Sequence, residues 1–345
     1  MAGPATGFVE ETLAAHRERM AAAVARYLPD REPRRWLYDL MAAYPSRVSK
    51  GIRSSLCVAT CRAFGGSTEE AMPSAAAIEL LHNAFLVHDD VEDGSLHRRG
   101  LPTLHLEHGL PLAINAGDGL AVVALTPLND NLRVLGSDMS RRVLDEFQTL
   151  MHRTIEGQAI ELGWRSENVV DLTPTDYLDM VLLKTCSYST IFPLRIGGMI
   201  GSWGGADLDA LTRFGFHLGA AFQIRDDLLN LEGRALPYGK EILGDLYEGK
   251  RTLMLIHLLS VADENERQWL NAFLRLGRSE RSDEKVGTAL AMMKDHGSIE
   301  FAREFSRGVS AAARESFDIA FDGVAPSEDL RFIEELIPYM LERES

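Results

Sequence analysis

The chain has 345 residues, of which 46% are hydrophobic and 25% charged, a balance typical of a soluble protein with a large core. Its 51 acidic residues outnumber its 36 Lys and Arg residues, which gives a formal net charge of −15. Nucleic acid and anionic membranes repel so acidic a chain, so neither is expected as a partner, and any local cluster of cations is informative.

The first residues, Met1 to Leu28, carry charges of both signs and lack the basic start and apolar run of a signal peptide. No stretch reaches the roughly 18 to 20 apolar residues that a membrane span needs, and the most apolar window, Ile191 to Trp203, is interrupted by proline, arginine and glycines. The three cysteines offer no second pair for a zinc site, and we expect buried reduced thiols at Cys57, Cys61 and Cys186. These features predict a cytoplasmic protein without a membrane span.

Helical periodicity dominates the chain, and alternating strand patterns are scarce. Ser67 to Glu70 is a capping box before a helix, and Thr173 to Asp176 is a second start signal with proline at the first helical position. The charged breaks 163–171 and 277–283 are typical of surface loops. We predict a single all-α domain over residues 1–345, with ten or more helices around one core. The clearest expected helices are Thr12–Leu28, Arg53–Phe64, Ala71–His88, Tyr177–Ser189 and Leu208–Leu231.

The strongest local feature is an acidic run, His88-Asp-Asp-Val-Glu-Asp93, after an apolar stretch. On a helix, Asp89 and Asp93 are one turn apart on the same face, with Asp90 beside them, so their charges repel one another. An isolated acidic run is often only a solvated helix face. Because this helix comes from the core, the run favours a cation-binding site instead.

A second acidic motif, Gln223-Ile-Arg-Asp226-Asp227, also follows an apolar run, and Asn230 adds an oxygen ligand nearby. Two such motifs, each at the end of a core helix, are harder to explain as solvated faces. Sites made only of oxygen ligands suit Mg²⁺, which keeps water and shares substrate phosphates, better than zinc or iron.

Cations follow each acidic motif. Each one alone is typical of a solvated surface, but acids and cations together predict a site for metal-chelated diphosphate. The metal would bridge carboxylates to phosphate oxygens, and Arg and Lys would neutralise the remaining charge. The cations are Arg98 and Arg99 after the first motif, Lys240, Lys250 and Arg251 after the second, and Lys50, Arg53 and Lys184 elsewhere.

In this order, the motifs resemble those of the trans-isoprenyl diphosphate synthases, which include farnesyl and geranylgeranyl diphosphate synthases. The resemblance extends from about residue 50 to 255, and it is specific because many short motifs agree in the family's order. The matching segments are Lys50–Arg53, Asp89–His105, Ala113–Asp118, Lys184–Thr185, Gln223–Asp227 and Tyr238–Leu253.

This resemblance implies a helical bundle around a central cavity and a magnesium-dependent prenyltransferase. Its substrates would be isopentenyl diphosphate and an allylic diphosphate, namely dimethylallyl, geranyl or farnesyl diphosphate. It further implies three Mg²⁺ ions in each active site and a homodimer.

The resemblance also implies a role for individual residues. The implied metal ligands are Asp89, Asp90, Asp93, Asp226, Asp227 and Asn230. Those implied to meet the allylic diphosphate are Arg98, Lys184, Lys240 and Lys250, and those for isopentenyl diphosphate are Lys50, Arg53, His82 and Arg99. Thr185 and Gln223 would lie near the carbocation, where oxygen dipoles stabilise it.

Three positions depart from the family's pattern. Asn230 stands where aspartate is commoner, and its amide oxygen can still coordinate a cation, so one metal contact at most is weakened. Ser54 and Met254 stand where proline is usual, and we attach no chemistry to either.

Other functions remain open at this stage. A terpene cyclase on the same scaffold would not need the residues implied for isopentenyl diphosphate, and a silent partner subunit would not need intact acidic motifs. Glu79 and His82 have the Glu-x-x-His spacing of di-iron bundles, but such sites need a second pair, which the chain lacks.

Product length is expected to depend on the helix that leads to Asp89, since each turn further back lies about 5 Å deeper. One turn back are Ala84 and Phe85, with Leu81 about one turn further. Relatives that make the C15 product tend to carry bulky aromatics at both of the first two positions. A bulky side chain at these positions would close the cavity that receives the growing chain, whereas the alanine here leaves it deeper. We therefore predict the C20 product, geranylgeranyl diphosphate, with C15 and C25 as neighbouring alternatives. Phe85 could instead belong to ordinary core packing.

Overall fold

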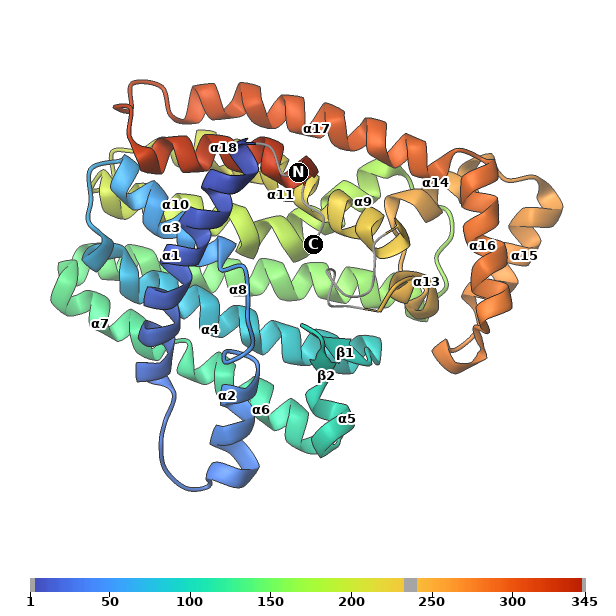
Figure 1. The fold of residues 1–345 in the computed structure, drawn as a ribbon, viewed down its shortest axis with the longest axis horizontal. Helices are drawn as coiled ribbons and strands as arrows, with labels where there is room; N and C mark the ends of the chain where they lie inside the picture. Colours follow the sequence, from blue (N-terminus) through green and yellow to red (C-terminus); the bar gives the residue numbers. More distant parts are fainter. Residues whose placement is uncertain (1–3, 233–240, 343–345) are drawn as a thin grey trace.

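The computed structural model describes residues 4–232 and 241–342, and the described chain is predominantly helical (Figure 1). The predicted all-α class is therefore confirmed. The helices of the first half are α1 (Pro4–Tyr27), η1 (Arg34–Tyr38), α2 (Asp39–Ala43), α3 (Ile52–Ala63), α4 (Thr68–Asp93), α5 (Leu104–His108), α6 (Leu110–Val123), α7 (Thr126–Val134) and α8 (Gly136–Ser166). Those of the second half are α9 (Pro174–Val181), η2 (Leu182–Ile191), α10 (Phe192–Gly201), α11 (Leu208–Glu232), α13 (Gly244–Glu248), α14 (Leu253–Val261), α15 (Glu264–Leu274), η3 (Arg278–Glu280), α16 (Asp283–Asp295), α17 (Ser298–Ala320) and α18 (Glu328–Glu342).

The two helices that carry the acidic motifs, α4 and α11, lie in the middle of the bundle. The π-helix η2 packs against both α8 and α11, and α4 packs against α3 and α6. The helix α17 covers α11 along one edge of the molecule (Figure 1). Segments far apart in the sequence therefore bring their chemistry to one central region.

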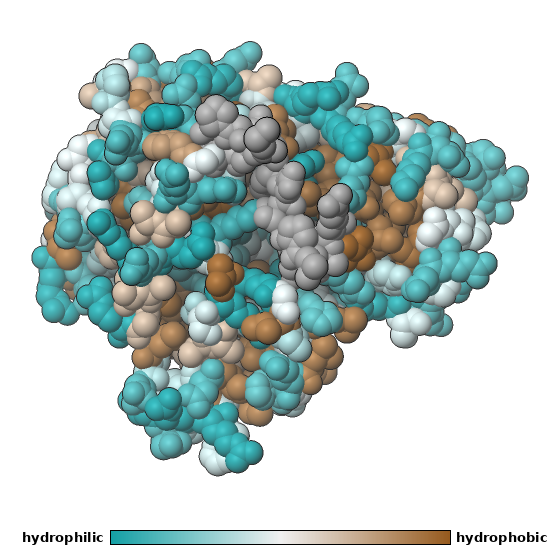
Figure 2. Space-filling view, in the orientation of Figure 1, coloured by the Kyte–Doolittle hydropathy of each residue, from teal (hydrophilic) through white to brown (hydrophobic). Residues whose placement is uncertain are grey.

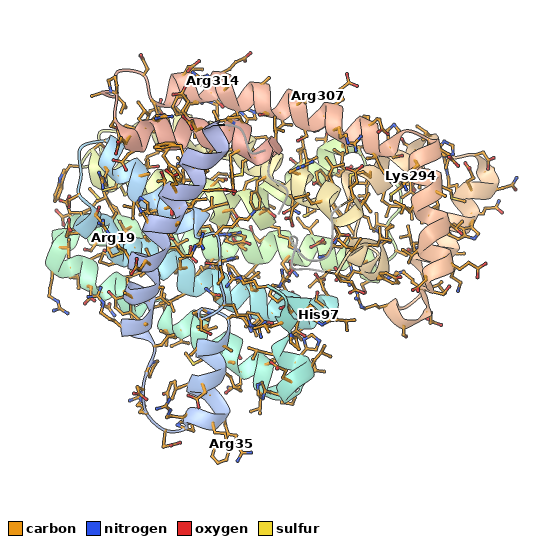
Figure 3. All side chains as sticks on the ribbon, viewed as in Figure 1. Arg19, Arg35, His97, Lys294, Arg307 and Arg314 are labelled. Carbon is orange, nitrogen blue, oxygen red and sulfur yellow. The ribbon has the colours of Figure 1, made fainter. Side chains whose placement is uncertain are left out.

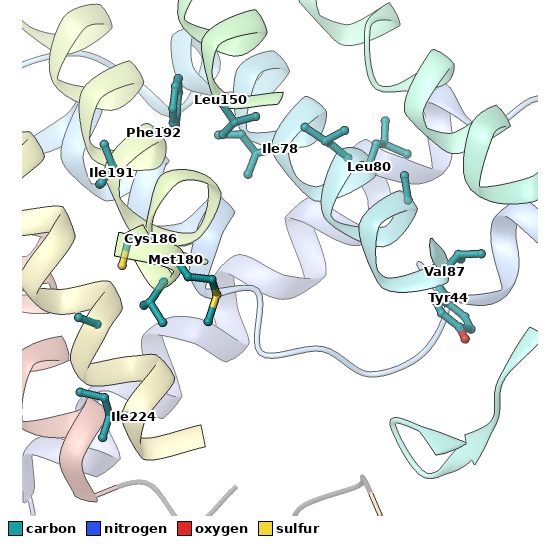
Figure 4. Packing of buried hydrophobic residues seen from close by; sticks show 14 of the residues in the cluster. Tyr44, Ile78, Leu80, Val87, Leu150, Met180, Cys186, Ile191, Phe192 and Ile224 are labelled. Atoms are coloured by element: carbon teal, nitrogen blue, oxygen red, sulfur yellow. The ribbon is translucent and has the colours of Figure 1, made fainter. Parts of the chain in front are cut away.

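The interior is built from the apolar faces of these helices. Figure 4 shows part of the main cluster of buried side chains, from Ile191 and Phe192 to Val87 and Tyr44. Charged side chains such as Arg19, Arg35 and Arg307 lie on the outside (Figure 3). Burial of apolar surface is the main force that holds such a bundle together.

Both predicted helix starts are confirmed, but several boundaries differ from expectation, and α1 begins at Pro4 rather than Thr12. Ser67 and Glu70 form a capping box at α4, and Thr173 and Asp176 form one at α9. The helix α4 continues through the whole acidic run and ends at Gly94, whose φ of 63° suits a residue without a side chain. The expected loop at 163–171 is partly wrong, because α8 continues to its residue 166.

A short hairpin that the sequence analysis did not predict follows the first acidic motif. Strand β1 (His97–Arg98) pairs antiparallel with β2 (Leu101–Pro102). The two turn residues, Arg99 and Gly100, have φ angles of 54° and 76°, the positive values that a tight two-residue turn requires. The turn folds the two arginines back toward α4.

The expected thiols are confirmed, since Cys57, Cys61 and Cys186 are free and buried. The stretch Leu110–Val134, rather than Ile191–Trp203, is long and apolar enough to cross a membrane by length and composition alone. Core helices of soluble proteins pass the same test, so this is a weak indication. On the face in Figure 2, apolar side chains are exposed low on the molecule. Leu106 in α5 and Leu110 in α6 are exposed apolar residues.

The close approach of α8 to η2 depends on Gly157. A Cβ atom there would overlap the backbone of Lys184, with its Cα only 2.6 Å away. We expect Gly157→Ala to lower the free energy of unfolding by about 1–3 kcal/mol, as overpacking usually does. Gly163→Ala on the same helix meets nothing within 4 Å and is the matched control. Thermal melting measures both, and equal melting temperatures would show that the helices can separate without cost.

Candidate active site

A cavity of about 1010 Å³ lies between α3, α4, α8, η2 and α11. Most of the predicted site residues line it, although they come from segments spread over two hundred residues of sequence. Those on its wall are Lys50, Arg53, Leu81, His82, Ala84, Phe85, Asp89, Arg98, Arg99, Lys184, Thr185, Gln223, Asp226, Asp227 and Lys250. Asp90, Asp93 and Asn230 lie outside the lining, and Lys240 lies outside the described residues.

The first acidic motif is held by cations from the hairpin and from two other segments. Asp89 lies 3.2 Å from the guanidinium of Arg98 and 3.3 Å from the ammonium of Lys184. Asp90 is fully buried, and it accepts hydrogen bonds from Arg98 Nε at 2.8 Å and from the Tyr44 hydroxyl at 2.5 Å. Asp90 therefore faces protein partners, whereas Asp89 faces the cavity.

Asp93 and Asn230 are likewise engaged by the protein. Asp93 pairs with Arg165 at 2.5 Å and with Lys250 at 2.6 Å. The Asn230 side-chain oxygen accepts the backbone N–H of Asp245 at 3.0 Å, and its amide donates to a carbonyl of the same segment. Asn230 thus ties the end of α11 to the start of α13 and to the residues just before it, and it does not line the cavity.

The second acidic motif forms a chain of hydrogen bonds. Asp227 accepts from the hydroxyl of Tyr177 at 2.8 Å and from the amide of Gln223 at 2.7 Å. The Gln223 oxygen in turn accepts from the hydroxyl of Thr185 at 2.9 Å. Burial raises the pKa of Asp227 to about 7, and the neighbouring Asp226 charge adds to the shift. Among the residues that the structure describes, this carboxylate is held by hydrogen bonds from uncharged groups.

A group of partly buried cations lies on another part of the wall. Arg53 donates to Tyr188 and Ser189 at 3.1 and 2.9 Å, and its Nε is buried without a hydrogen-bond partner among the described residues. Burial, with three other arginines nearby, lowers the pKa of Arg99 to about 10. Burial also lowers the pKa of His82 well below its usual value, and its Nδ1 lacks a partner in the described chain. Partly buried cations and open polar atoms of this kind suit an anion.

Several residues of the site had escaped the sequence analysis. Tyr44 and Tyr177 donate to the aspartates, and Glu161 pairs with Lys184. Arg17 from α1 also lines the cavity. None belongs to a recognisable motif, because only packing of distant helices brings them to the cavity.

The chemistry of the donors fits magnesium, although no three Asp, Glu, His or Cys side chains in the described part of the chain could bind one ion together. The cavity wall instead offers Asp89 from α4 and Asp226 and Asp227 from α11. Mg²⁺ commonly takes one or two carboxylates and completes its shell with water and phosphate oxygens. The same observation leaves no di-iron centre at Glu79 and His82 among the described residues.

One departure from the family's pattern has a structural consequence. Ser54 donates to buried Glu79 from its hydroxyl at 2.9 Å and from its backbone N–H at 3.4 Å. Proline could make neither bond, so the view that this position carries no chemistry is too simple.

The three residues expected to limit the product all line the cavity. Leu81 and Ala84 are buried, and Phe85 is partly buried. The Phe85 ring meets that of Tyr188 edge to face, with centroids 5.7 Å apart. Phe85 thus lines the cavity and also packs against the hydrophobic core, so its role in product length stays a prediction.

Comparisons with known proteins show the family of the chain. Residues 34–293 match the family model described as polyprenyl synthetase. Geranylgeranyl diphosphate synthase from Saccharolobus solfataricus is 36% identical over 267 residues, which cover 77% of this chain and 79% of that protein.

Two solved structures share the fold over nearly their whole length. Geranylgeranyl pyrophosphate synthetase from Pyrococcus horikoshii has 31% identity and a TM-score of 0.84, with 97% of this chain and 99% of that chain covered. Geranylgeranyl pyrophosphate synthase from Corynebacterium glutamicum, complexed with isoprenyl diphosphate and magnesium, has 25% identity, the same TM-score and the same coverage. The chain therefore belongs to the polyprenyl synthetase family, and it is a prenyltransferase of the trans-isoprenyl diphosphate synthase type.

The raised pKa of Asp227 predicts an effect of pH on stability. Because the folded pKa lies above the ordinary value of about 3.9, the folded chain binds more protons than the unfolded chain between about pH 4 and 7. Stability is therefore lost as pH rises through this window. Asp227→Asn should raise the melting temperature of the metal-free protein at pH 8, and the gain should shrink toward pH 5.

Asp130→Asn is the matched control, since Asp130 accepts a similar bond from Tyr27 at 2.8 Å near the surface. A pH-independent gain for Asp227→Asn, or an equal gain for the control, would contradict a stability cost from the buried Asp227 charge.

Proposed function

We propose that this protein condenses isopentenyl diphosphate with an allylic diphosphate, assisted by Mg²⁺, and releases mainly geranylgeranyl diphosphate. The observation that carries the proposal is a single cavity with carboxylates on α4 and α11 and a separate group of partly buried cations. One diphosphate needs metal and therefore carboxylates, whereas the other needs only cations. A cavity with both groups accommodates two diphosphates.

The reaction begins when the allylic C–O bond breaks and diphosphate leaves with the bonding electrons. The double bond of isopentenyl diphosphate then attacks the carbocation, and a proton is lost to form the new double bond. Bound Mg²⁺ would stabilise the charge that develops on the leaving group. Asp89, Asp226 and Asp227 are the residues that would hold the ions. The number of ions, three in each active site, stays a prediction.

Cations of the chain would meet the remaining charge of the leaving group. Lys184, Arg98 and Lys250 lie on the cavity wall beside the carboxylates. Such preorganised charges stabilise a departing anion without further rearrangement. The Thr185 hydroxyl and the Gln223 amide would face the carbocation, and released diphosphate is proposed to take the proton, because no protein base is evident.

Isopentenyl diphosphate would bind to the second group of cations. Arg53 and Arg99 are largely buried and near each other, and Lys50 and His82 line the same cavity. A terpene cyclase would not need this group, and a silent subunit would need neither group. Both alternatives are therefore less well supported than the synthase.

The relatives and the cavity together support a C20 product. The similar proteins from Saccharolobus and Pyrococcus are named geranylgeranyl diphosphate synthases. On α4, the small side chain of Ala84 leaves space, and Phe85 with Tyr188 supplies a floor. C15 and C25 products remain the neighbouring alternatives.

We also propose one domain over residues 1–345, a cytoplasmic location and a homodimer. The dimer is supported by exposed apolar side chains on α6 and α8, among them Ile114, Val122 and Leu144. A monomer would leave these in water, whereas an interface would bury them.

The central experiment is turnover of labelled isopentenyl diphosphate with each allylic primer, with and without magnesium. We expect activity only with magnesium and its loss on chelation. Asp89→Ala and Asp226→Ala should reduce turnover by about a hundredfold or more, since each removes charge stabilisation from the leaving group. Asp130→Ala, near the surface, is the control. Near-normal turnover of either variant at saturating magnesium would refute the assignment of the carboxylates.

Product length provides a separate test. Ala84→Phe should shorten the product and Phe85→Ala should lengthen it, because the first adds and the second removes a ring at the floor. Chromatography of the dephosphorylated products measures both. Release of the wild-type product by both variants would place the floor elsewhere.

A further inference from the structure

We propose that Tyr44 and Tyr177 are positioning residues, each of which fixes the second aspartate of one acidic motif without neutralising its charge. The inference rests on the proposed function, because it concerns how the same metal-diphosphate site is held. In both acidic motifs, a buried tyrosine hydroxyl donates to the second aspartate, although the two tyrosines belong to unrelated segments.

The two tyrosines make matching contacts. The Tyr44 hydroxyl, just after α2, donates to Asp90 Oδ2 at 2.5 Å. The Tyr177 hydroxyl, on α9, donates to Asp227 Oδ2 at 2.8 Å. Both tyrosines are 1% exposed. Buried hydrogen bonds of this length to a charged acceptor are among the stronger ones in proteins.

In each motif the other carboxylate oxygen is also engaged. Asp90 Oδ1 accepts from Arg98, and Asp227 Oδ1 accepts from the amide of Gln223. With both oxygens bonded, neither carboxylate can rotate about its χ2 torsion without losing a bond. The aspartates therefore fix their other partners, namely Arg98, which also reaches Asp89, and Gln223, which accepts from Thr185.

A phenol is suited to this task because it donates without carrying charge. Burial raises the pKa of both tyrosine hydroxyls, so they remain protonated donors at ordinary pH. A lysine or arginine in place of Tyr177 would cancel the charge of Asp227, which lies on the cavity wall, whereas Asp90 already pairs with Arg98. Asp93, paired with Arg165 and Lys250, shows the contrasting arrangement.

Tyr44 has a further contact that makes the test selective. Its backbone carbonyl accepts from Arg99 at 2.9 Å, and this bond survives when the hydroxyl is removed. Tyr44→Phe should therefore weaken the metal-dependent diphosphate site while the isopentenyl diphosphate site keeps its arginine.

The experiment uses the full chain with Tyr44→Phe, Tyr177→Phe and, as control, Tyr27→Phe. Tyr27 donates to Asp130 at the same 2.8 Å as Tyr177 does to its aspartate, but away from the cavity. Four quantities are measured for each variant: the melting temperature, the Mg²⁺ concentration for half-maximal turnover, the affinity for inorganic pyrophosphate at fixed Mg²⁺ by calorimetry, and the KM for isopentenyl diphosphate.

We expect both site variants to need about tenfold more Mg²⁺ and to bind pyrophosphate about tenfold more weakly, the effect of one lost hydrogen bond to a charged group. The KM for isopentenyl diphosphate of Tyr44→Phe should stay within about twofold of wild type, because its contact to Arg99 is retained. Tyr27→Phe should change neither the Mg²⁺ requirement nor the pyrophosphate affinity.

A lower melting temperature with unchanged Mg²⁺ requirement and pyrophosphate affinity would make the tyrosines merely structural and overturn the inference. If one variant fails to fold, the other decides, and failure of both to fold also overturns it. An inactive wild-type protein would instead refute the proposed function, so the two failures are distinguishable.

Discussion

The organisation of the site depends on the repulsion among aspartates held near one another in a partly dry cavity. Two acidic helix ends meet there, and like charges repel more strongly where water is excluded. Burial raises the pKa of Asp227 to about 7, and the neighbouring Asp226 charge adds to this shift. In this chain, arginine and lysine neutralise some of the carboxylates, and uncharged hydrogen-bond donors hold others in place.

This division has a chemical consequence. Asp93 is neutralised by Arg165 and Lys250, and Asp90 is tied to Arg98. Asp226 and Asp227, on the opposite helix, lie on the cavity wall, where metal and diphosphate would bind. A site with carboxylates on one side of the cavity and cations on the other is suited to a ligand that brings both metal and phosphate.

The fold places side chains from segments that are far apart in the sequence around one cavity. The turn at Arg99 and Gly100 brings two arginines back onto α4, and one of them joins the metal side while the other joins the cation group. The absence of a side chain at Gly157 lets η2 approach α8 closely enough to bring Lys184 to Asp89. A two-residue turn and a single glycine therefore determine which cations lie beside the carboxylates.

The sequence by itself determined the helical class, both capped helix starts and the membership of most residues in one site, because periodicity, capping residues and ordered motifs are local signals. It could not reveal which aspartates reach the cavity, since Asp89 and Asp90 are adjacent in sequence yet face different surroundings. The roles of Tyr44, Tyr177 and Glu161 were equally hidden, because their contacts join segments between 23 and 50 residues apart. Only the tertiary structure decided these points, since burial and side-chain direction arise when the helices pack together.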